Sequence, residues 1–205
     1  MKRFCFLIFL LFLSNATKSE IISCKKLILS KGLKFKSSSE LPFSGKCMNL
    51  YTNGKVHLVE NFVDGKRSRE SIHYYENGEI LSSANYSNGF KNGLSKTYYE
   101  TGVLKSIINY KQNLKHGDFR SYLQNGNLYI LRSYKNGLKN GEERNYYENG
   151  DLQEIINYKF DEREGDYYKF YKKNGQIMER GYFKKGVQDE EKKIQYFENG
   201  TIKPN

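Results

Sequence analysis

The chain has 205 residues, a hydrophobic content of 38% and a formal net charge of +11 at pH 7. Its aromatic residues are 18 tyrosines and 13 phenylalanines without a tryptophan, glycine is frequent, and only two prolines occur. A composition rich in tyrosine, glycine, asparagine and lysine and poor in alanine excludes a mainly helical protein and favours strands joined by tight turns.

The first sixteen residues have the pattern of a secretory signal peptide. Lys2 and Arg3 precede an apolar run at residues 4–13, and small residues follow it at positions 14–16. The apolar run is too short to cross a bilayer, which needs about 20 residues. A lipoprotein acylated at Cys24 is disfavoured, because the polar residues 17–20 separate this cysteine from the apolar run. We therefore expect residues 1–16 to be cleaved and the protein to be exported to the periplasm, the cell surface or the medium.

Removal of residues 1–16 would leave 32 basic and 23 acidic residues, a net charge of +9. A basic surface favours acidic proteins, anionic lipids or envelope polymers as partners. Alternatively, the lysines only keep a strand-rich surface soluble and block pairing at sheet edges. Nucleic acid is not an expected partner of an exported chain.

Two cysteines, Cys24 and Cys47, remain after the predicted cleavage. An even pair in an oxidising compartment suggests one disulfide, which would join an N-terminal lead-in, residues 17–42, to the first repeat. Two free buried thiols are the alternative.

A turn motif, usually Asn-Gly and mostly preceded by aromatic residues, recurs along residues 43–205 and is called the anchor turn below. Its glycines are Gly54, Gly78, Gly102, Gly126, Gly150, Gly175 and Gly200, with spacings of 24 or 25 residues. A second turn follows each anchor glycine by about 11 residues, up to the one at Gly186. Two turns per period leave two strands, so the sequence predicts about seven β-hairpin repeats of 24–25 residues.

The strand after each anchor turn carries an apolar residue two positions past the glycine and an aromatic residue eight positions past it. Leu104 and Tyr110 are one such pair, after Gly102. Because these positions differ by an even number, they point to one face of a regular strand. One hairpin cannot bury this stripe, whereas stacked hairpins form continuous ladders. We expect an all-β, elongated, single-sheet antiparallel meander, with both residues of each Asn-Gly turn at positive φ.

The segments GLSKTYYETGVLKSIINYKQNLKHG (residues 93–117) and GEERNYYENGDLQEIINYKFDEREG (residues 141–165) show the unit most clearly. In period, turns and apolar positions they resemble the variant form of the MORN repeat. The resemblance implies a non-catalytic, MORN-like solenoid of hairpins that binds proteins or membrane lipids. Similar bacterial proteins are classed as YwqK-type antitoxins, which would neutralise a toxin by binding it. The signal peptide departs from that class, and nothing here could encode the kinase domain of some eukaryotic MORN proteins.

Aromatic residues before the anchor turns are the candidate contact surface. They are Tyr74, Tyr75, Tyr98, Tyr99, Tyr122, Tyr146 and Tyr147. Adjacent tyrosines point to opposite faces of a strand, so one of each pair leaves the core side and lies among lysines. The alternative is that the tyrosines only build the core ladder.

No arrangement of residues indicates catalysis or a bound cofactor. His57, His73 and His116 lie at different repeat positions without metal-ligand spacing. The glutamates beside the anchor turns recur with the period, which indicates a structural position. We expect an exported interaction module with an unidentified protein partner, antitoxin-like, immunity-like or host-contacting. The alternative is a basic structural protein that docks on anionic lipids or envelope polymers. In either case, exposed edge strands could pair two chains into a homodimer.

Overall fold

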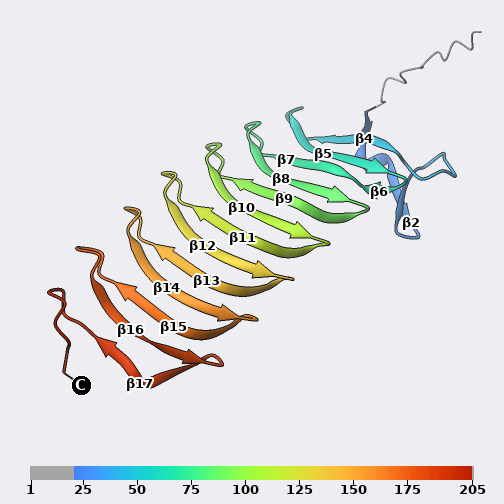
Figure 1. Cartoon of the computed structure of the whole chain (residues 1–205). Coiled ribbons are helices and arrows are strands. Elements are labelled where there is room, and N and C mark those ends of the chain that lie inside the picture. Colours follow the sequence, from blue (N-terminus) through green and yellow to red (C-terminus); the bar gives the residue numbers. More distant parts are fainter. Residues whose placement is uncertain (1–20, 205) are drawn as a thin grey trace, which may run out of the picture.

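The computed structural model describes residues 21–204 and is built almost entirely of strands (Figure 1). The predicted signal peptide lies outside the described residues. The elements in chain order are β1 (Ile22–Ser23), the 3₁₀ turn η1 (Cys24–Lys26), β2 (Leu27–Ser30), β3 (Leu33–Lys36), β4 (Gly45–Leu50), β5 (Val56–Val63), β6 (Lys66–Arg67), β7 (Arg69–Tyr74), β8 (Ile80–Ser87), β9 (Phe90–Tyr98), β10 (Leu104–Lys111), β11 (Leu114–Tyr122), β12 (Leu128–Lys135), β13 (Leu138–Tyr146), β14 (Leu152–Lys159), β15 (Glu162–Phe170), β16 (Ile177–Lys184) and β17 (Val187–Gln195).

Fifteen of these strands form one sheet, in which the order along the sheet follows the order in the chain. From β4 to β17 every neighbour is antiparallel, whereas β1 pairs with β4 in parallel and β2 with β3 forms a separate hairpin. Figure 1 shows the hairpins side by side along one long axis, with their turns on two opposite long edges. The predicted all-β meander of hairpins is confirmed.

The anchor turns hold a single residue at positive φ. In the turn after β7, the amide of Gly78 donates to the carbonyl oxygen of Tyr75 at 3.0 Å. The amide of Tyr75 donates to the carbonyl oxygen of Glu79 at 2.8 Å. Gly78 has φ of 100°, whereas Asn77 is not among the positive-φ residues. Instead, the side-chain oxygen of Asn77 accepts from the amide of Glu79 at 2.8 Å. The prediction of positive φ at both Asn and Gly is therefore wrong for these turns.

The second turns adopt the two-residue geometry that the sequence suggested for the anchors. Asn88 and Gly89 have φ of 50° and 86°, and both central residues are at positive φ in each of the other second turns as well. This geometry matches the twist of a hairpin but strains residues other than glycine and asparagine. At Phe160, φ is nevertheless 54°.

A cluster of Leu27, Phe43, Cys47 and Phe62 forms a core at the start of the ribbon. From β7 on, the core is a row of side chains along the middle of one face, here called the packed face. Cross-strand partners place one residue per strand in this row: Ser71, Ala84, Ser95, Ile108, Phe119, Arg132, Glu143, Ile156, Tyr167 and Gly181. Ile108, Ile156 and Tyr167 are buried, whereas Leu104 and Tyr110 on the flanks are only half-buried. The predicted stripe thus flanks the deepest row, whose members on the strands after the anchor turns lie six residues past the anchor glycine.

Candidate interaction surfaces

Tyrosine hydroxyls join most of the anchor turns to the next repeat. The hydroxyl of Tyr75 donates to the carbonyl oxygen of Tyr98 at 2.8 Å. The hydroxyl of Tyr99 donates to the carbonyl oxygen of Tyr122, also at 2.8 Å. Tyr147 donates likewise to Phe170 at 2.8 Å. The second tyrosine of each predicted pair is therefore half-buried and engaged within the ribbon. The series is interrupted at Leu123, which has no hydroxyl.

The first tyrosine of each pair ends its strand. These residues are Tyr74, Tyr98, Tyr122 and Tyr146, and all four are half-buried. A contact role for them stays a prediction, while the bonds of their neighbours show why an adjacent aromatic pair recurs at this place.

Asparagine amides reinforce the same edge. Nδ2 of Asn77 donates to the carbonyl oxygen of Glu100 at 2.9 Å, and Nδ2 of Asn174 donates to that of Glu198 at 2.7 Å. The asparagine of the anchor motif thus orders its own turn and also bonds to the next one. This fixes the glutamates at one position in successive turns, with their side chains exposed to solvent.

A series of cations and aromatic rings lines the packed face near the second turns. Lys91 pairs across its hairpin with Tyr86 and places Nζ 5.2 Å from the ring centre of Tyr110 in the next hairpin. The equivalent distance from Lys115 to Tyr134 is 4.9 Å. The remaining contacts are Arg67 over Tyr86, Lys139 over Tyr158 and Arg163 over Phe183. Sequence reasoning found the rings and missed the cations, although a basic residue recurs 13 positions past five anchor glycines.

Carboxylates in the packed face have basic partners. Glu143 is buried and lies 2.9 Å from Nε of Arg132 and 3.1 Å from Nζ of Lys139. Glu60 is paired with Arg67 at 2.6 Å. These ion pairs lie on the ribbon's own structural row, so they account for the buried charge without a catalytic role.

Near β17, Glu179 is the centre of a polar network. It accepts from the Tyr167 hydroxyl at 3.0 Å, from Lys169 Nζ at 2.9 Å and from Gln195 Nε2 at 3.0 Å. Burial by itself would raise the pKa of Glu179, but these donors outweigh it and lower that pKa. Burial, together with the bond to Glu179, raises the pKa of the Tyr167 hydroxyl.

Two histidines from different repeat positions are neighbours. The ring centres of His57 and His73 are 6.4 Å apart, and the ring centre of His57 lies 4.5 Å from that of Tyr51. Burial lowers the pKa of His73. Within residues 21–204, no further His, Cys, Asp or Glu completes a metal-ligand group with them.

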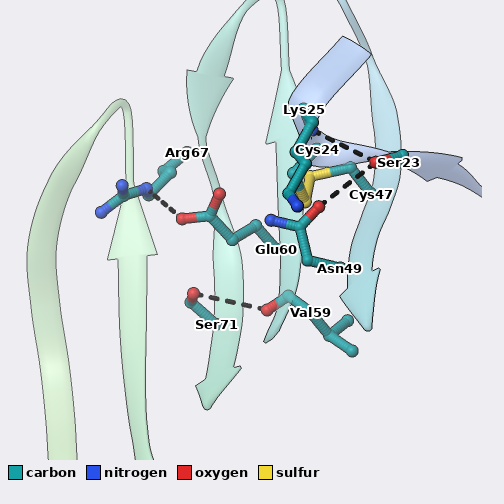
Figure 2. Close-up of a disulfide and its surroundings, with 9 residues drawn as sticks. All are labelled: Ser23, Cys24, Lys25, Cys47, Asn49, Val59, Glu60, Arg67 and Ser71. Carbon is teal, nitrogen blue, oxygen red and sulfur yellow. Dashed lines mark hydrogen bonds and ion pairs between the residues drawn. A yellow bond between two sulfur atoms is a disulfide. The ribbon is translucent and has the colours of Figure 1, made fainter. Parts of the chain in front are cut away.

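A disulfide joins Cys24 and Cys47, with their Cα atoms 4.9 Å apart (Figure 2). It attaches η1 to β4 at the beginning of the ribbon, and Oγ of Ser23 donates to Oδ1 of Asn49 beside it at 3.3 Å. Ligand atoms of Cys24, Cys47 and Glu60 lie within 4.8 Å of one another. Since the two sulfurs are bonded to each other and Glu60 is paired with Arg67, this group fits a covalent staple and not a metal centre.

The two long edges differ in charge. The second-turn edge is defined as residues 63–67, 87–91, 111–115, 135–139, 159–163 and 184–188, and the anchor-turn edge as residues 51–55, 75–79, 99–103, 123–127, 147–151, 171–176 and 197–201. The second-turn edge holds 11 basic and 3 acidic residues, a net charge of +8. The anchor-turn edge holds 3 basic and 6 acidic residues, a net charge of −3. The ribbon therefore has one basic and one acidic long edge.

Apolar side chains are exposed along the basic edge. Phe90, Leu114 and Leu138 occupy the same position in three successive hairpins and are 40–50% exposed. Val63, Phe160 and Val187 on this edge are exposed as well. A lysine directly follows Phe90, Leu114 and Leu138, so this edge alternates apolar and basic groups along the ribbon. Across residues 21–204, no helix combines the length and apolar character that a membrane span requires.

Comparison with known families identifies the repeat. The family model described as "MORN repeat variant" matches four consecutive units, residues 70–88, 91–112, 115–136 and 139–160. Each matched unit consists of two strands joined by an anchor turn, from β7 and β8 in the first unit to β13 and β14 in the last. A comparison with curated proteins found no significant match.

Proposed function

The four repeats of residues 70–160 belong to the MORN repeat variant family, and we propose that the chain is an exported, non-catalytic module that binds a protein partner along its second-turn edge. Repeats of this family generally bind proteins or membrane lipids, and the all-β hairpin ribbon is a binding-repeat type of fold. Export rests on the predicted signal peptide, and the disulfide between Cys24 and Cys47 is consistent with an oxidising compartment.

The observation that carries this proposal is the exposed apolar row formed by Phe90, Leu114 and Leu138. Covering a large apolar side chain contributes roughly 1.5–3 kcal/mol, so three in line provide a substantial part of an interface. The adjacent Lys91, Lys115 and Lys139 would favour a partner with acidic groups and would speed its association.

An antitoxin-like or immunity-like role, or contact with a host cell, would follow from the identity of that partner. A toxin that is itself exported fits an exported module, because the two would meet outside the cytoplasm. Binding along an extended edge also matches the general mode of repeat proteins, which present long surfaces to their partners.

Docking on anionic lipids or envelope polymers is the second candidate. The net charge of +8 along one edge favours it, as do the phenylalanines Phe90 and Phe160 among the lysines. Such docking depends mainly on charge, whereas a protein interface with apolar anchors depends less on it.

The test uses residues 17–205 as bait for proteins of the cell envelope and the medium, at physiological salt. Leu114→Ser/Leu138→Ser removes two of the three residues of the apolar row. Leu50→Ser/Ile202→Ser is a matched control, because Leu50 and Ile202 are 50% and 64% exposed and lie beside anchor turns on the opposite long edge. A stoichiometric protein that is captured by the wild type and the control, and lost with Leu114→Ser/Leu138→Ser, supports the proposal.

The second candidate is tested on vesicles with and without anionic lipid. Binding that requires the anionic lipid, disappears as salt is raised and is unchanged by Leu114→Ser/Leu138→Ser would favour surface docking. If the double variant captured the same protein as the wild type, the second-turn edge would not be the binding surface.

A further inference from the structure

We propose that the basic second-turn edge of one chain binds the acidic anchor-turn edge of a second copy, so that ribbons associate side by side. The inference rests on the opposite charges of the two edges, +8 and −3. It goes beyond the proposed function, since it concerns contacts between copies and not a foreign partner. It also differs from pairing of edge strands, because it joins turns along the length of the ribbon.

The two edges share one spacing. Anchor turns and second turns alternate along the same hairpins, so each kind recurs every two strands, which is about 9–10 Å. The acidic edge of another copy carries carboxylates in four of its seven anchor turns, residues 75–79, 99–103, 147–151 and 197–201. Because both edges have the same spacing, these carboxylates can face the lysines of several second turns at once.

The charged groups are available at both edges. Glu76, Glu100 and Glu148 are exposed, and no carboxylate of these three forms an ion pair within residues 21–204. Asparagine amides hold the backbone at Glu76, Glu100 and Glu148, which keeps the glutamates at one repeated position. Ordered backbone on the acidic side reduces the conformational entropy lost on association.

The basic side offers Lys111, Lys135 and Lys159, which are exposed and have no ion-pair partner in the described part of the chain. Each lies across its hairpin from the first residue of the next strand, so Lys111 is beside Leu114 and Lys135 beside Leu138. Association would therefore cover apolar surface together with the charges. A single exposed ion pair is weak, so the contact needs several repeats in register.

The contact is heterologous, since a different edge is used on each copy. Every associated pair leaves one free basic edge and one free acidic edge, so the assembly can continue beyond a dimer. Association should rise with protein concentration and fall as salt shortens the screening length to about 8–10 Å.

Charge exchange between the edges tests the proposal by sedimentation velocity on residues 17–205 at low salt. One variant reverses the acidic edge from −3 to +3, Glu76→Lys/Glu100→Lys/Glu148→Lys, and the other lowers the basic edge from +8 to +2, Lys111→Glu/Lys135→Glu/Lys159→Glu. We expect the wild type to form dimers and larger species, each variant alone to sediment as a monomer, and an equimolar mixture of the two to form heterodimers again.

Two controls separate this result from net charge and from misfolding. Lys25→Glu/Lys26→Glu/Lys46→Glu changes the net charge as much as the basic-edge variant does, but at exposed lysines off both edges, and should associate like the wild type. Unchanged urea midpoints would show that the variants fold. A wild type that stays monomeric at the highest attainable concentration overturns the proposal. So does association that survives in both edge variants, or a folded mixture that fails to associate.

The same variants separate self-association from the function proposed above. Anionic vesicles, or a protein partner of the second-turn edge, should still bind the acidic-edge variant, whose basic edge is intact. Loss of self-association with retained partner binding would uphold both proposals, and retained self-association would overturn only the contact between copies.

Discussion

The phenolic hydroxyl of Tyr99 donates a hydrogen bond to the carbonyl oxygen of Tyr122, 2.8 Å away and 23 residues later in the chain. We expect Tyr99→Phe to lower the free energy of unfolding by about 0.5–1.5 kcal/mol, because the ring stays and one hydrogen bond is lost. Urea unfolding measures the difference. Tyr98→Phe is the matched control, since the Tyr98 hydroxyl has no hydrogen-bond partner in residues 21–204.

The reverse experiment uses Leu123, where the series of tyrosine hydroxyl bonds between repeats is interrupted. Leu123 occupies the equivalent place in the fourth unit, and Leu123→Tyr would offer a hydroxyl to the next repeat. A gain in stability is the expected sign. Equal stability losses for Tyr99→Phe and Tyr98→Phe would show that the bond contributes little.

The turn between β14 and β15 is strained at Phe160, which has φ of 54° and is 58% exposed. Phe160→Asn should raise the free energy of unfolding by about 1 kcal/mol, because asparagine adopts this conformation at lower cost. Thermal or urea unfolding provides the measurement. Phe90→Asn, at a similarly exposed phenylalanine outside the positive-φ set, should give no such gain.

The disulfide between Cys24 and Cys47 closes a loop with a sequence separation of 23. The chain-entropy model gives about 3 kcal/mol for a loop of this size. We expect reduction, or Cys24→Ser/Cys47→Ser, to destabilise the beginning of the ribbon by that order. Hydrogen exchange should quicken around β1 and β4 and stay unchanged in β12 to β14. Uniform quickening along the chain would mean that the staple stabilises the ribbon as a whole.

The network around Glu179 makes stability depend on pH on the acid side. Its donors hold the pKa of this carboxylate lower in the folded than in the unfolded chain. The resulting stabilisation is present above the unfolded pKa and is lost as pH falls through the folded pKa. Glu179→Gln should therefore be less stable than the wild type at neutral pH and approach it in acid, below about pH 4. A difference that stays constant across urea titrations from neutral to acid pH would contradict this.

The two turns in each period of 24 or 25 residues predicted the hairpins, because they leave room for two strands per repeat. Which turn takes which geometry was not predictable from the Asn-Gly pair. The five-residue span from Tyr75 to Glu79 makes the anchor turn longer than a two-residue loop, and a side-chain bond from Asn77 replaces the second positive φ.

The candidate surface was only partly accessible to sequence reasoning. Alternation along a strand indicated that Tyr98 and Tyr99 differ in direction, but the bond from Tyr99 depends on the distance between neighbouring repeats. The cation over each ring was missed for the same reason, since Lys91 contacts Tyr110 of the next hairpin. Contacts between repeats require the register of the sheet, which no single unit contains.

The hydroxyl bonds of the anchor turns join residues 23 to 25 positions apart, and from β7 to β17 each strand pairs with its immediate neighbours in the chain. Proteins whose contacts are close in sequence form them at low entropic cost and fold quickly for their length. Each hairpin can dock on the preceding one as soon as it has left the ribosome, without waiting for the rest of the chain. The ribbon can in this way lengthen or shorten by whole units, in folding as in evolution, while every remaining repeat keeps its neighbours.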